Sequence, residues 1–121
     1  MRPTFLLSIA AATVLAAPVL AQSGNYTWTG YARSKSDSPN CAVAKMKIDV
    51  TVTGTEVKGL FQQQGRTQRN FQATADAAGS FRTKAQVGGG GIMDVKGTIN
   101  NTTATVTLDG YCRWDAKLTK Q

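Results

Sequence analysis

The chain has 121 residues, with 14 basic and 7 acidic side chains, no histidine and a formal net charge of +7 at pH 7. The lack of histidine excludes Ser-His-Asp and Cys-His catalysis and every metal site that uses an imidazole ligand. A basic balance of this size favours anionic partners, although it also serves solubility.

The first residues predict export. Arg2 precedes an apolar run from Phe5 to Leu15, and small residues before Gln22 complete the pattern of a secretory signal peptide. The run is shorter than the about 20 residues that a membrane-spanning helix needs. We therefore expect residues 1–21 to be removed and residues 22–121 to form one periplasmic or secreted domain without a transmembrane anchor. The loss of Arg2 lowers the formal net charge by one, from +7 to +6.

Alternating apolar and polar residues, which are typical of half-buried strands, fill the rest of the chain. The alternation is strictest from Ala44 to Thr53, where every second residue is apolar. Turn residues separate the segments, and Asp109-Gly110 predicts a two-residue type I′ turn with a positive φ at both residues. Gly88 to Gly91 predicts a hairpin tip. In chain order, the predicted strands are 26–33, 44–53, 57–61, 70–75, 81–87, 92–99, 104–108 and 112–118.

These segments predict an all-β domain. About eight short strands with short connections favour an antiparallel up-and-down meander. Cys41 and Cys112 are the two cysteines of the chain, and in an oxidising compartment we expect them to form one disulfide. A disulfide requires Cα atoms within about 7 Å of each other. This pairing favours closure of the meander into a small barrel or a tight sandwich, with the last strand beside the first.

The inward-facing positions predict a filled interior. Small residues alternate there with large side chains, and two tryptophans must be accommodated between short strands. A packed interior disfavours a hollow carrier, so a small-ligand carrier with a calycin-like barrel is a second alternative function. The large side chains expected inside are Trp28, Met46, Ile48, Phe61, Phe71, Phe81 and Trp114.

The acidic residues do not predict an active site. A glycosidase needs two carboxyl groups that face each other across a cleft, about 5 to 10 Å apart. The acidic residues of this chain fall instead at predicted turns and on outward strand positions. We expect a protein that is not an enzyme and that uses no cofactor and no metal.

A basic outer wall is the main candidate site. Closure of the meander places segments 112–118, 26–33 and 44–53 side by side, with cations and tyrosines facing outward. Such a surface suits sugar faces, phosphates or carboxylates, through charge-assisted hydrogen bonds and stacking. The alternative is a solvated face whose charges discourage edge-to-edge pairing. The candidate residues are Tyr31, Arg33, Lys45, Lys47, Tyr111, Arg113 and Lys117.

The polar segment 62–70 is a second candidate. Its glutamines and asparagine, together with Arg66 and Arg69, suit an anionic or polyhydroxylated partner. It also fits an ordinary polar loop. Nucleic acid is not expected as a physiological partner, because the signal peptide predicts export.

Several short motifs carry a resemblance: W-x-G at Trp28, Cys41 before the strictest strand, G-x-F at Gly79, G-x-I at Gly97, and G-Y-C-x-W-x-x-x-L from Gly110. Over nearly all of the mature chain they resemble a small exported β domain of Gram-negative bacteria, which occurs alone or appended to larger proteins. The resemblance implies a compact β fold with one cysteine pair, and it assigns no activity.

Two functions lead. The first is a secreted or periplasmic, non-catalytic binding module for an anionic envelope polymer, a glycan or a lipid headgroup. The second is a protein-interaction domain, such as an inhibitor of a secreted hydrolase, with another envelope protein as its partner. The sequence leaves the oligomeric state open.

Overall fold

The structure is a computed structural model that describes residues 25–35, 41 and 45–121. The predicted signal peptide and residues 36–40 and 42–44 lie outside the described residues. One short 3₁₀ turn, η2 (Gly88–Gly90), joins two of the strands. The strands are β1 (Asn25–Ser34), β2 (Met46–Thr53), β3 (Glu56–Gln63), β4 (Arg69–Thr74), β5 (Ser80–Val87), β6 (Gly91–Ile99), β7 (Ala104–Asp109) and β8 (Arg113–Lys120).

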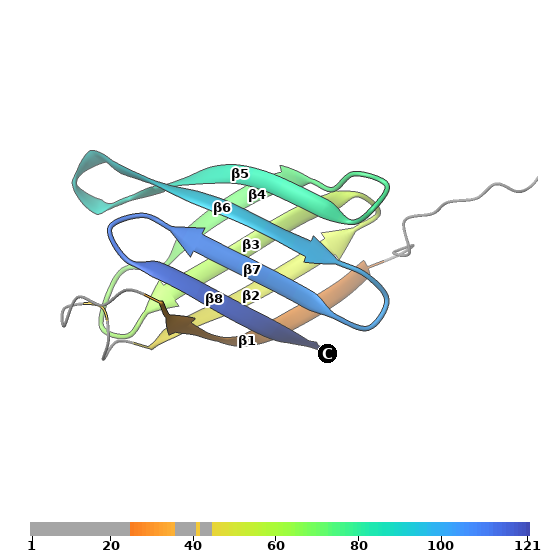
Figure 1. Ribbon diagram of the computed structural model, residues 1–121, viewed down its shortest axis with the longest axis horizontal. Helices are drawn as coiled ribbons and strands as arrows, with labels where there is room; N and C mark the ends of the chain where they lie inside the picture. The colour runs from red at the N-terminus through yellow and green to blue at the C-terminus, as the bar shows by residue number, and fades with distance from the viewer. Residues whose placement is uncertain (1–24, 36–40, 42–44) are drawn as a thin grey trace, which may run out of the picture.

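All pairings in the sheet are antiparallel. The 8-stranded sheet has the order β4-β3-β2-β1-β8-β7-β6-β5, so β8 returns to pair with β1. The sheet curls until β4 and β5 lie side by side, although the described residues form no hydrogen-bonded ladder between them. The result is a nearly closed barrel (Figure 1), which confirms the predicted all-β meander of eight strands.

Aromatic packing closes the gap between β4 and β5. The rings of Phe71 on β4 and Phe81 on β5 stack with centroids 6.0 Å apart and planes at 14°. Phe71 also covers its cross-strand partner Gly59, where a Cβ atom would lie 2.1 Å from the ring. Phe81 covers Gly97 on β6 in the same way. Glycine on each flanking strand therefore gives the two rings room to bridge the gap.

The middle of the barrel is filled, as expected. Trp28 and Trp114 are 0% and 1% exposed, and the large side chains predicted to face inward all belong to one buried cluster. β2 alternates between buried and non-buried residues along its whole length, as its sequence predicts. Among the described residues, the Trp28 indole N–H is the one buried side-chain polar group without a hydrogen-bond partner.

The meander places alternate connections at opposite ends of the barrel (Figure 1). We call one of them the cysteine end; it carries the β1–β2, β3–β4, β5–β6 and β7–β8 connections. We call the other the turn end; it carries the β2–β3, β4–β5 and β6–β7 connections, together with Asn25 and Gln121. Because successive strands run in opposite directions, all cysteine-end connections share one surface.

The predicted type I′ turn at Asp109-Gly110 is wrong. β7 ends at Asp109 and β8 begins at Arg113, with these two residues paired in register, so the connection has three residues instead of two. Gly110 does not have a positive φ. A Cβ atom at this position would lie 3.1 Å from the Cε atom of Met93, which is a tight contact that a small shift of the methionine side chain would relieve.

Candidate functional site

The strand order assembles the predicted basic wall. β1 lies between β2 and β8, with Tyr31 opposite Lys47 and Arg33 opposite Asp115. Tyr31 is 63% exposed. We define the basic wall as Tyr31, Arg33, Lys35, Lys45, Lys47, Arg113 and Lys117.

Lys35 is a member of the wall that the sequence reasoning missed. Its backbone N–H donates to the carbonyl oxygen of Arg113 at 2.7 Å, which continues the β1–β8 pairing beyond Ser34. The predicted strand ends at Arg33 and so leaves Lys35 outside it. Extending the alternation of strand 26–33 by two residues would have placed it beside Arg33 on the outer face.

Two carboxylates lie among the cations of the wall. Asp49 accepts a hydrogen bond from the Thr29 hydroxyl and lies 3.8 Å from the Lys47 ammonium. Asp115 accepts a hydrogen bond from the Thr107 hydroxyl at 2.9 Å. Among the described residues, six basic side chains of the wall therefore outnumber two acidic ones.

Tyr111 is separate from the wall. The sequence predicted it to face outward from the last strand, but it lies in the β7–β8 connection and is 82% exposed. There it lines a cleft of about 790 Å³ at the cysteine end. The sequence did not predict this cleft.

The cleft combines buried apolar side chains with two arginines. Met46, Phe61, Met93 and Trp114 are all buried and form its apolar lining. The second candidate segment contributes Arg66 and Arg69, and none of the described residues that line the cleft is acidic. The structure thus brings together the two arginines of that segment at the cleft, in the β3–β4 connection and on β4, outside strands β8, β1 and β2 of the basic wall.

Arg69 occupies an inward-facing position. It pairs with the buried residue Phe61 across β3 and β4, and paired residues of an antiparallel ladder face the same side of the sheet. The side chain is half-buried, and its Nη2 atom would lie 3.1 Å from a Cβ atom on Gly88. Among the described residues, no carboxylate lies within ion-pair distance of the guanidinium of Arg66 or Arg69.

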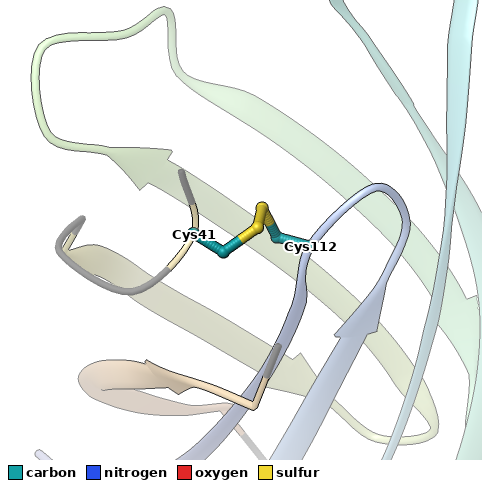
Figure 2. The surroundings of a disulfide bond; sticks show 2 residues. All are labelled: Cys41 and Cys112. Atoms are coloured by element: carbon teal, nitrogen blue, oxygen red, sulfur yellow. A yellow bond between two sulfur atoms is a disulfide. The ribbon is translucent and has the colours of Figure 1, made fainter. Parts of the chain in front are cut away.

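The predicted disulfide is confirmed, and it supports one side of the cleft. Cys41 and Cys112 are bonded with their Cα atoms 5.7 Å apart and 71 residues apart in sequence (Figure 2). The bond fastens the β7–β8 connection, whose residues Gly110, Tyr111 and Cys112 line the cleft. The disulfide therefore fixes the position of this part of the rim.

One pair of carboxylates comes together elsewhere, which the sequence reasoning did not predict. Asp94 on β6 lies directly opposite Asp109 on β7, and both are exposed. The Lys84 ammonium donates to Asp94 at 2.6 Å, and this hydrogen bond lowers the pKa of the carboxyl. A general acid needs a raised pKa, so Asp94 does not have the environment of a catalytic acid.

Among the described residues, no group of three or more acidic or cysteine side chains is arranged to hold a metal ion. None of these residues belongs to a helix with the length and apolar character needed to cross a membrane.

No protein-family model matches the chain, and the comparison with curated proteins gives no match. The resemblance to a small exported β domain of Gram-negative bacteria therefore stays a prediction.

Proposed function

We propose that the domain is a non-catalytic binding module for an anionic glycan or another anionic polymer of the cell envelope, and that it binds along the basic wall. The observation that carries this proposal is the order β8-β1-β2, which gathers six basic side chains and one exposed tyrosine on one outer face. The envelope location follows from the predicted signal peptide.

The spacing of the wall suits a chain of repeated negative charges. Neighbouring strands lie about 4.8 Å apart, and outward residues on one strand recur about every 7 Å. Long lysine and arginine side chains bridge these distances to neighbouring carboxylates or sulfates on a polymer. Tyr31 lies beside Lys47 and offers an exposed ring for stacking on a sugar.

Retention on dextran sulfate, compared with uncharged dextran, tests the proposal. We expect the protein to be retained on dextran sulfate at low salt and released as salt rises. The Debye screening length falls from about 10 Å at 0.1 M to about 3 Å at 1 M. The triple variant Arg33→Gln, Lys47→Gln, Lys117→Gln should elute at clearly lower salt than the wild type.

A second triple variant provides the matched control. Lys58→Gln, Arg82→Gln, Lys96→Gln removes the same charge from exposed positions on β3, β5 and β6, outside the basic wall. It should elute close to the wild type. Equal shifts for both triple variants would mean that only net charge matters and would overturn the proposal. If neither triple variant loses retention, and the protein forms a stoichiometric complex with an envelope protein that survives high salt, the protein-interaction domain is favoured instead.

A further inference from the structure

We infer that the cleft at the cysteine end is a separate binding site for a single-chain amphiphile with an anionic headgroup. In this arrangement Arg66 and Arg69 bind the headgroup, while the alkyl chain lies on the apolar lining. Neither arginine belongs to the basic wall, so substitutions can test the two sites separately.

The size and chemistry of the cleft fit such a ligand. Its volume of about 790 Å³ falls within the range of about 300–1,000 Å³ that is usual for small-molecule sites. Such sites are mostly apolar with a few polar groups that fix orientation. The accessible apolar surface here comes mainly from Ile92 and Tyr111, since the other large apolar lining side chains are at most 7% exposed, and the two arginines supply the polar part.

The environment of the Arg69 guanidinium favours an anionic ligand. A guanidinium that is partly removed from water loses hydration, and a carboxylate partner normally compensates for this loss. Arg69 is half-buried on the inward-facing side of β4, and the described residues place no carboxylate within ion-pair distance. The planar guanidinium also matches the two oxygens of a carboxylate or phosphate. An anionic ligand would therefore supply the missing partner.

Exposed apolar residues flank the same cleft. Ile92 is 52% exposed and Tyr111 is 82% exposed, and both line the cleft. They are two of the four large apolar or aromatic side chains that stay exposed among the described residues. Exposed apolar groups at a concave site mark a surface that binds another apolar group. An alkyl chain covers them, whereas a hydrophilic anion alone does not.

Titration with decanoate, followed by the two tryptophan indole N–H signals in NMR spectra of the ¹⁵N-labelled protein, tests the inference. Trp114 lines the cleft, while Trp28 does not. We expect decanoate to move the Trp114 signal in a saturable manner and to leave the Trp28 signal in place. Decanol, which has the same chain without the charge, should bind at least tenfold more weakly. Octanoate should bind about tenfold more weakly than decanoate, because it buries two fewer methylene groups.

The variant Arg69→Gln locates the headgroup. It should weaken decanoate binding about tenfold and leave decanol binding unchanged, since the lost interaction is charge-assisted. Arg82→Gln, an exposed arginine on β5 outside the cleft, is the matched control and should bind decanoate as the wild type does.

Three outcomes would overturn the inference: equal affinity for decanoate and decanol, an unmoved Trp114 signal, or undiminished decanoate binding by Arg69→Gln. Because the comparison of decanoate with decanol uses the wild-type protein, it does not depend on the folding of any variant. Dextran sulfate retention of Arg69→Gln should match that of Arg82→Gln, so a failed cleft and a failed basic wall give different results.

Discussion

The two ends of the barrel satisfy their polar groups in different ways. At the turn end, the Asp76 carboxylate accepts hydrogen bonds from the backbone N–H groups of Ala78 and Ser80, both at 2.9 Å. The Asn100 side-chain oxygen accepts from the N–H groups of Thr102 and Thr103 at 2.9 and 2.8 Å. Each of these turns is thus stabilised by its own side chain. The cysteine end has a local contact of this kind, from the Gln62 amide to the carbonyl oxygen of Arg66 at 2.8 Å, and differs in having a cleft whose rim is fastened by a disulfide.

The cations of the two ends show the same contrast. The Lys120 ammonium at the turn end lies 3.8 Å from the centroid of the Tyr26 ring and donates to the carbonyl oxygen of Asn101 at 3.2 Å. Lys120 is therefore already used within the fold. Arg66 and Arg69 at the cysteine end have no carboxylate within ion-pair distance among the described residues. Neither arginine therefore forms an ion pair with the described part of the fold.

Removing the disulfide should have the largest effect on this contrast. For the double variant Cys41→Ser, Cys112→Ser we expect a loss of about 4 kcal/mol in the free energy of unfolding, because the bond closes a long loop in the unfolded chain. Urea denaturation measures this loss. Native-state hydrogen exchange should accelerate more at the Gly110 amide, which donates to the carbonyl oxygen of residue 112 at 3.1 Å, than at Ala78 and Gly79. Equal acceleration at both ends would contradict a local role for the disulfide at the cysteine end.

A smaller effect on stability is expected when one cation at each end of the barrel is substituted. Lys120→Gln should lower the free energy of unfolding by about 1 kcal/mol, because it removes the cation–π contact with Tyr26. In a domain of about 100 residues, this corresponds to a fall in Tm of about 4–8 °C. Arg69→Gln should not lower stability, because no ion pair is lost. Thermal unfolding of the two variants measures both effects. A loss in Arg69→Gln as large as that in Lys120→Gln would show that Arg69 serves the fold.

The strands and the basic wall could be predicted from the sequence because both depend on local alternation. Segment 44–53 alternates without exception, and the expected disulfide requires the meander to close. The first strand must then lie between the second strand and the last one. The turn at Asp109-Gly110 could not be predicted from its two residues alone. Its length follows from the register in which Asp109 pairs with Arg113, which leaves three residues between the two strands.

The cleft could not be predicted because residues from distant parts of the chain form it. Met46, Arg69, Met93 and Trp114 come from four different strands, and no sequence spacing connects them. One signal was available. The alternation that buries Phe71 extends back by two residues to Arg69, which places an arginine on the inward-facing side. The predicted strand began one residue later and so left Arg69 in a loop.

The smallest predicted effect concerns a cation that is already paired, Lys84. Its hydrogen bond to Asp94 lowers the pKa of this exposed carboxyl. Since the pKa is lower in the folded state than in the unfolded state, the pair stabilises the fold above the ordinary aspartate pKa, and this contribution is lost as pH falls through the folded-state value.

Lys84→Gln should raise the pKa of Asp94, as followed by NMR titration of its carboxyl carbon. Lys58→Gln is the control, because Lys58 lies on β3 and does not contribute to the lowered pKa. An unchanged pKa in Lys84→Gln would show that this cation, like Arg69, is not committed to a partner within the fold.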